Sequence, residues 1–165
     1  MKQYLALTLL AVIALLTSCG SSDATAYKDL VFGMSLEDVQ AKGYLASDEQ
    51  SISEEGLPTY QLRFTDFAGV NYEKAEVSFR DNKLAKVHLY NSTTDALKQR
   101  EISKKITEYL TSNYGKSKPA TSKIDGWKDE KRTFLLYIHS EFDEHMKNIL
   151  INELSICSND YYKAK

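Results

Sequence analysis

Three histidines, two cysteines and 23 acidic side chains are the groups in this sequence with the chemistry for catalysis or metal binding. No histidine stands in an HExxH pattern, and no CxxC or Cys-His spacing matches a zinc site. The segment HSEFDEH, residues 139–145, brings His139 and His145 together with three carboxylates around a predicted turn. These side chains are possible ligands for a weakly held metal ion, but the solvated acidic end of a hairpin has the same composition and is commoner.

Catalytic motifs are also missing from the sequence. No serine lies in a GxSxG elbow, no glycine-rich loop follows a predicted strand, and no pair of carboxylates is marked out by its spacing. The sequence therefore predicts a protein that is not an enzyme, with no cofactor and no bound metal. A metal-dependent hydrolase that uses residues 139–145 is the alternative hypothesis.

The N-terminal residues have the pattern of a secretory signal. Lys2 is followed by the apolar run LALTLLAVIALL, residues 5–16. At about 1.5 Å per residue, this run is shorter than the roughly 30 Å hydrocarbon core that a spanning helix must cross. The residues Leu16-Thr17-Ser18-Cys19 resemble the bacterial lipobox, in which an aliphatic residue and two small residues precede the cysteine that receives lipid.

The lipobox resemblance implies that residues 1–18 are a lipoprotein signal peptide and that Cys19 carries a diacylglycerol thioether and an acylated amine. Several buried acyl chains make a stable membrane anchor, whereas a single chain is marginal. Residues 19–26 then form a lipidated tether of small, mainly polar composition. No Asp follows Cys19 directly, which favours the outer membrane by resemblance to the sorting rules of some Gram-negative bacteria. We therefore expect a lipid-anchored protein of the bacterial cell envelope.

An ordinary cleaved signal is the alternative interpretation, in which Cys19 later pairs with Cys157 in the oxidising envelope. The lipobox explains the position of Cys19, and a disulfide does not. Under the lipobox interpretation, Cys157 at the end of the apolar run ELSIC is expected to be a small buried hydrophobe.

Composition places the rest of the chain among ordinary globular proteins. The formal net charge is -2, and no basic stripe is present to recruit nucleic acid. Hydrophobic residues make up 42% of the chain and there are only two prolines, which argues against a disordered protein. We expect a single domain over residues 27–165, because a chain of this size can bury a substantial core.

Two helices are predicted. The first lies in GMSLEDVQAKG, residues 33–43, where Ser35 caps the N-terminus and Gly43 ends the helix. The second is long, opening at Thr93 or Thr94 with Asp95 and ending at Gly115. Its apolar residues on one face are Ile102, Ile106, Tyr109 and Leu110.

Alternation of apolar and polar residues predicts the first strands. It is clear in PTYQLRFTDF, residues 58–67, and in the hairpin EKAEVSFRDNKLAKVHLYN, residues 73–91. Asp81 and Asn82 tolerate the turn geometry of that hairpin, and the parity of Leu84 indicates a bulge just after the turn.

The C-terminal third adds two apolar runs, residues 133–142 and 148–157, which predict central strands joined by an acidic turn. TSKIDGW, residues 121–127, is expected to add an edge strand, and residues 44–57 are either a strand or a loop. The predicted fold class is α+β, in the order helix-strands-helix-strands. An antiparallel sheet carries a short N-terminal helix and one long helix packed on one face.

Three stretches resemble a known fold group: FGMSLEDV (residues 32–39), VSFRDNKLAKVHLY (residues 77–90) and YLTSNYGK (residues 109–116). They are similar to the entry helix, hairpin and later helix of the group that includes the beta-lactamase inhibitory protein and the outer-membrane assembly lipoprotein BamE. The resemblance implies a protein that binds other proteins without catalysing a reaction.

Strand alternation also predicts a candidate binding face. One set of apolar residues is expected to face the helices: Val87, Leu89, Phe134, Leu136 and Ile138. The intervening residues then lie on the opposite face: His88, Tyr90, Leu135, Tyr137 and His139. Aromatic side chains give a large contact area at low entropy cost, so the candidate binding residues are His88, Tyr90, Tyr137 and His139. A second covered face, or ordinary mixed strand chemistry, is the alternative.

The leading hypothesis from the sequence is a non-enzymatic envelope lipoprotein that acts as a protein-binding or assembly module. Its expected partners are the membrane, through the lipid, and a protein of the cell envelope. The main alternative is an inhibitor of a periplasmic or extracellular enzyme, with SDEQSISEEG, residues 47–56, as the inhibitory loop.

Overall fold

The computed structural model describes residues 25–163 of the chain. The predicted signal peptide and lipobox, including Cys19, lie outside the described residues, as does most of the predicted tether. Among the described residues, no helix combines the length and the apolar character needed to cross a membrane.

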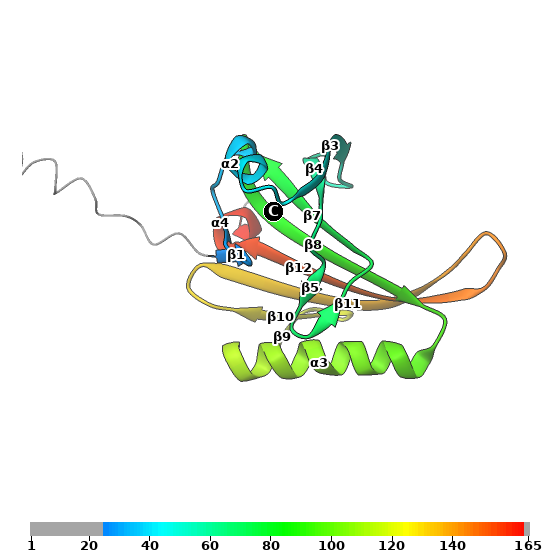
Figure 1. Ribbon diagram of the computed structural model, residues 1–165. Helices are drawn as coiled ribbons and strands as arrows, with labels where there is room; N and C mark the ends of the chain where they lie inside the picture. The colour runs from blue at the N-terminus through cyan, green and yellow to red at the C-terminus, as the bar shows by residue number, and fades with distance from the viewer. Residues whose placement is uncertain (1–24, 164–165) are drawn as a thin grey trace, which may run out of the picture.

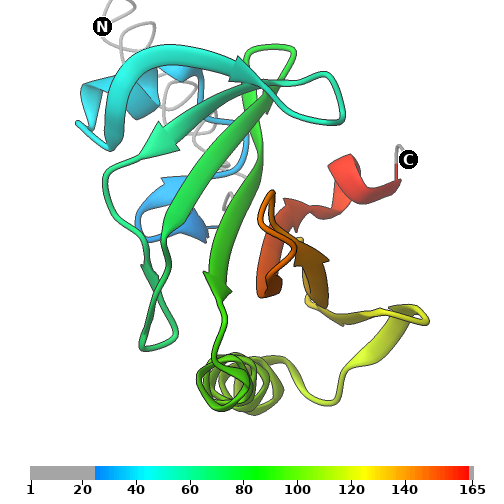
Figure 2. The same cartoon turned by 90° about the vertical axis from the view of Figure 1, so that its right-hand side faces the viewer.

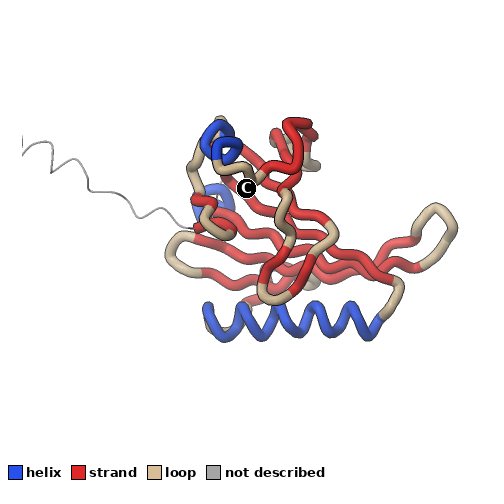
Figure 3. The backbone as a smooth tube through the Cα atoms, in the orientation of Figure 1, coloured by secondary structure: helices blue, strands red, loops and turns tan. Residues whose placement is uncertain are grey.

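Strands dominate the molecule, making up 52% of the described part against 22% for helices (Figure 3). Eight of them form one antiparallel sheet in the spatial order β3-β4-β7-β8-β12-β11-β10-β9. Their bounds are β3 Leu45–Ile52, β4 Pro58–Leu62, β7 Lys74–Arg80, β8 Lys83–Thr93, β9 Lys118–Thr121, β10 Ile124–Lys128, β11 Arg132–Phe142 and β12 Asn148–Ser158.

The remaining elements are short, with one exception. Two small antiparallel pairs are β1 (Thr25–Tyr27) with β2 (Leu30–Val31) and β5 (Asp66–Phe67) with β6 (Val70–Asn71). The helices are α2 (Leu36–Ala41), α3 (Ala96–Tyr114) and α4 (Asn159–Lys163). Figure 1 shows α2 and α3 on opposite sides of the molecule, and the view turned by 90° in Figure 2 agrees.

The pairing of β8 with β12 joins two groups of strands into one sheet. One group precedes α3 in the chain and the other follows it, and α3 links β8 in the middle of the sheet to β9 at its edge. Buried residues of both groups share one hydrophobic cluster, together with residues of α3. Its members include Leu62, Val77, Leu89, Ile106, Trp127, Phe134 and Leu154.

The predicted helix ends are confirmed. At α2, the side chain of Ser35 accepts a hydrogen bond from Asp38 N, and Asp38 caps Ser35 N in return. At α3, the carboxylate of Asp95 accepts hydrogen bonds from the first backbone N–H groups, and Gly115 is the C-cap with φ 79°. These caps depend on residues within one turn of the helix end, so they can be predicted from the local sequence.

The predicted β7–β8 turn and bulge are also confirmed. Asp81 and Asn82 have φ values of 52° and 57°, as a two-residue turn with the hand of the strands requires. Just after the turn, Ser78 pairs with Lys86 and Phe79 pairs with Leu84, so one extra residue is accommodated in β8.

The predicted α+β class, with two helices on one face of the sheet, is wrong. The described chain is mostly β, it is built on one large eight-stranded antiparallel sheet, and it begins with β1–β2 and ends with α4. The strand content was underestimated at the edge of the sheet. Residues 45–52 form the edge strand β3 although only Leu45 is buried, because an edge strand needs a neighbour on one side only.

The prediction that Ile138 is buried in the core is also wrong. Val87, Leu89, Phe134 and Leu136 are buried as expected, but Ile138 is 41% exposed. The pairing of β10 with β11 ends at Tyr137, so Ile138 lies where the sheet has already narrowed.

Candidate binding face

The four candidate residues share one surface of the sheet, opposite the hydrophobic core. We call this surface the outer face. Tyr90 of β8 lies opposite Glu153 of β12, which lies opposite Tyr137 of β11. Directly paired residues in antiparallel strands point to the same side, so these three side chains form one row across the sheet. The neighbouring rows contain His88 and His139, as the alternation predicted.

One end of the outer face is covered by α4. Tyr161 of this helix packs with Cys157 and Ala85 in a small hydrophobic cluster. Cys157 is only 2% exposed, which confirms the prediction that it is a small buried hydrophobe. The guanidinium of Arg80 lies 4.3 Å from the centre of the Tyr161 ring, and the Tyr161 hydroxyl is hydrogen-bonded to Glu55.

His88 lies between two carboxylates on the outer face. Its Nδ1 is 3.9 Å from Glu76 Oε2 of β7, and its Nε2 is 3.6 Å from Glu153 Oε2 of β12. Lys74 Nζ is 2.7 Å from the other oxygen of Glu76. The result is a line of alternating charges that crosses three neighbouring strands.

This arrangement shifts the pKa of the histidine and of both carboxylates. Burial disfavours the charged imidazolium, but the carboxylates of Glu153 and Glu76 outweigh burial and raise the pKa of His88. The same contacts with His88 hold the pKa of Glu153 and of Glu76 below its usual range. No local pattern in the sequence indicates this network, because Glu76, His88 and Glu153 come together only through strand pairing.

Tyr137 and His139 form a stacked pair beside this network. Their ring centres are 4.1 Å apart and the planes differ by 12°. His139 Nε2 is 3.2 Å from Glu141 Oε1, while its Nδ1 is buried and has no hydrogen-bond partner among the described residues. The stack gives this part of the outer face a flat aromatic surface of fixed geometry.

The segment HSEFDEH is split by the structure. His139 lies on the outer face, whereas His145 lies in the exposed turn beyond β11. Within residues 25–163, no group of three or more His, Cys, Asp and Glu side chains is placed to hold a metal ion.

The segment considered as an inhibitory loop, residues 47–56, is mostly strand. Its first part belongs to β3, and a short turn from Ser53 leads into β4. Ser53 fixes this turn, because its hydroxyl accepts a hydrogen bond from Leu57 N and its backbone N–H donates to Leu57 O. The segment is thus a paired edge hairpin.

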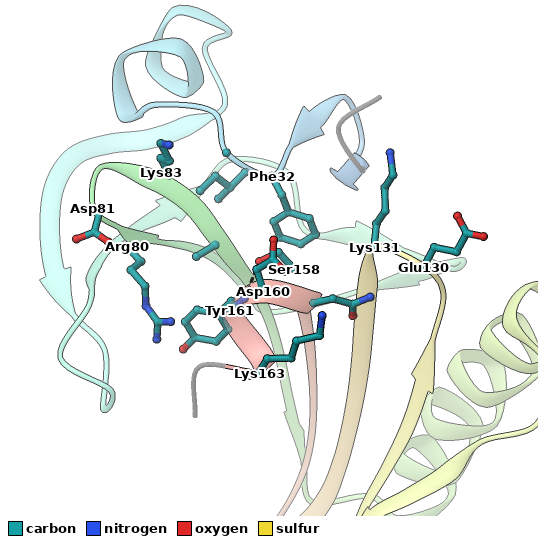
Figure 4. A pocket seen from close by; sticks show the side chains of 14 residues that line it. Phe32, Arg80, Asp81, Lys83, Glu130, Lys131, Ser158, Asp160, Tyr161 and Lys163 are labelled. Carbon is teal, nitrogen blue, oxygen red and sulfur yellow. Dashed lines mark hydrogen bonds between the residues drawn. The ribbon is translucent and has the colours of Figure 1, made fainter. Parts of the chain in front are cut away.

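A cleft of about 580 Å³ lies beside α4, at the covered end of the sheet (Figure 4). Its charged lining includes both signs: Arg80, Lys83, Lys131 and Lys163, with Asp81, Glu130 and Asp160. Because these side chains come from three separate segments, no local pattern in the sequence predicts the cleft. Mixed charge of this kind does not select an anion or a cation.

Comparison with protein-family models, with curated proteins and with solved structures found no match. The resemblance of residues 32–39, 77–90 and 109–116 to the fold group of the beta-lactamase inhibitory protein therefore stays a prediction. The interpretation of the outer face rests on its geometry and chemistry alone.

Proposed function

We propose that this chain is a lipid-anchored protein of the bacterial envelope that binds a protein partner through its outer face and catalyses no reaction. The observation that carries the proposal is the row of Tyr90, Glu153 and Tyr137, with His88 and His139 on either side. Tyrosine supplies a large contact area with few rotatable bonds, and the charge network supplies selectivity.

The lipid anchor is the second part of the proposal. It is supported by the resemblance of Leu16–Cys19 to a lipobox, and the residue after Cys19 supports the outer membrane as the destination. In cells fed an acyl-chain probe, the wild-type chain should be labelled and Cys19→Ala should not. Equal labelling of the two chains would contradict the anchor while leaving the outer-face proposal standing.

The outer-face proposal is tested by photo-crosslinking of the full chain in intact cells. A benzophenone amino acid is placed at position 137 or 90, and the matched control is placed at Tyr109, a 38% exposed tyrosine of α3. We expect one discrete protein adduct from positions 137 and 90 and none from position 109. The adduct from position 137 should weaken at least tenfold when Tyr90→Ala is added, because the two side chains lie in one row.

Two results would overturn the outer-face proposal. One is the same adduct from positions 137, 90 and 109, which would show that the partner contacts the chain without preferring the outer face. The other is a Tyr90→Ala chain that folds normally and still forms the adduct from position 137 at full yield.

A further inference from the structure

The hairpin of β11 and β12 projects beyond the rest of the sheet, at the right of Figure 1. The pairing of β10 with β11 ends at Tyr137, and that of β8 with β12 ends at Leu150. Residues 138–149, which we call the arm, have no further strand beside them. Most side chains of the arm are therefore exposed.

The tip of the arm is ordered by its own hydrogen bonds. The Asp143 carboxylate accepts hydrogen bonds from His145 N at 2.9 Å and from Lys147 N at 2.8 Å. Asp143 O also accepts one from Met146 N, at 2.9 Å. A tip already held in one conformation loses little entropy when it docks.

The arm is both apolar and acidic. Three of its large apolar side chains are exposed: Ile138 at 41%, Phe142 at 68% and Met146 at 76%. Its acidic residues are Glu141, Asp143 and Glu144, against one lysine, Lys147. Exposed Phe and Met on a projecting element are typical of an interaction surface.

The opposite end of the sheet has a pocket of complementary character. It has a volume of about 410 Å³ and lies where β9, β10 and β11 meet the ends of α3 and α4. Its apolar and aromatic lining is Tyr114, Pro119, Ala120, Trp127, Leu135 and Tyr162. Its charged lining is Lys116, Lys118 and Lys128, with no acidic residue. We call it the lysine-rimmed pocket.

Gly126 is part of the lining of this pocket. A Cβ atom there would lie 3.3 Å from Lys118 O and 3.6 Å from the Leu135 side chain, so a larger residue at this position would press on the lining. None of the three lysines forms an ion pair within residues 25–163, since every salt bridge in that part of the chain involves another lysine, Arg132 or a histidine. Their charge is available to an acidic ligand.

The arm cannot enter the pocket of its own chain. Leu135 lines the pocket, and Phe142 lies further along the same strand, β11. At about 3.3 Å per residue, the strand separates the two side chains by about 23 Å. An arm that fills such a pocket must come from a second molecule.

We propose that the arm of one copy docks into the lysine-rimmed pocket of a second copy. Phe142 enters the pocket, and the acidic residues of the arm lie against its lysines. The arm is acidic and the pocket is rimmed by lysines, and the apolar side chain of Phe142 matches the apolar lining of the pocket. These two matches favour a second copy of the chain as the occupant. Two different surfaces meet, so the contact is head-to-tail and repeats into a row or a closed ring.

Disulfide crosslinking of the full chain in its membrane tests this contact. Cells that express Phe142→Cys together with Ala120→Cys should give a disulfide-linked dimer, and the double variant on one chain should give a ladder of larger species or one ring. The matched control replaces Phe142→Cys by Leu97→Cys, which is 74% exposed but lies on α3, and it should give at least tenfold less product. The wild-type chain, with its own two cysteines, sets the background.

Sedimentation of the detergent-solubilised chain gives a second readout. Phe142→Ala should weaken self-association about 30-fold, as expected for the loss of a central interface side chain. Its melting temperature should not change, because the side chain is 68% exposed in a single copy. Lys118→Glu should also weaken association, and adding Glu144→Lys to a second population should restore mixed pairs.

Three outcomes would overturn the proposal. The first is a wild-type chain that stays monomeric at high concentration and forms no crosslink above the Leu97→Cys control. The second is a crosslink between two Phe142→Cys arms but none to Ala120→Cys. The third is an arm that crosslinks to a different protein and not to a second copy. None of these outcomes bears on the outer face, because its test uses positions 90 and 137.

Discussion

At the scale of single residues, the position of His88 between Glu76 and Glu153 ties the stability of the outer face to pH. The folded state raises the pKa of His88 above its ordinary value of 6.5, so the stabilisation is complete below pH 6.5 and is lost as the pH rises through the folded pKa. The carboxylates have lowered pKa values, so their contribution is complete above about pH 4.5 and is lost in stronger acid. The network is therefore strongest between about pH 5 and 6.

His88→Gln tests this dependence. We expect its cost in free energy of unfolding, relative to the wild type, to be larger at pH 5.5 than at pH 8 by about 1 kcal/mol, because half-buried charged hydrogen bonds contribute on this order. Urea denaturation of both chains at the two pH values measures it. Lys74, Lys86 and His139 also face this network and are present in both chains, so their effects cancel. A constant difference across pH would contradict the prediction.

A matched histidine serves as the control for this experiment. The side chain of His145 is 71% exposed in the turn of the arm and lies 3.6 Å from Glu144, which is 87% exposed. Solvent screens a pair of this kind almost completely. His145→Gln should therefore leave the free energy of unfolding at both pH values within the error of the measurement.

At the scale of elements, local signals were sufficient where a few neighbouring residues determine the structure. The caps at Ser35 and Asp95 and the turn at Asp81 all arise from contacts within a few residues, and all were predicted correctly. For residues 44–57, which include strand β3, the sequence does not decide between a strand and a loop, because the exposed residues of β3 show no alternation. Its formation depends on β4 beside it, and local sequence carries no information on that pairing.

The candidate binding face could be predicted only as far as local alternation determines it. A period of two places Tyr90 on one side of β8 and Tyr137 on one side of β11. The charge partners of His88 were not predictable, because Glu153 meets it only through the pairing of β8 with β12. The arm was missed as well, since alternation continues through Ile138 although the neighbouring strand has ended.

At the scale of the whole molecule, the β8–β12 pair determines whether the two groups of strands behave as one unit. The pairing runs from Thr93 with Leu150 to Lys86 with Cys157, and core residues from both groups pack together. The α+β prediction placed a short and a long helix on one face of an antiparallel sheet. In the structure, one eight-stranded sheet joins the two groups without a break.

Because the sheet is continuous, we expect a substitution near one edge to lower the unfolding free energy that is measured near the other edge. Leu62 lies on β4 and is 1% exposed, whereas Trp127, the only tryptophan, lies on β10 and is 2% exposed. Leu62→Ala should lower the free energy of unfolding by about 2–5 kcal/mol, because it leaves a cavity in a shared core. The fluorescence of Trp127 in urea should report that full loss, with the same midpoint as circular dichroism. Leu97→Ala, at a 74% exposed position, should shift neither signal. A Trp127 transition that keeps its wild-type midpoint in Leu62→Ala would show that the β8–β12 pair does not couple the two groups.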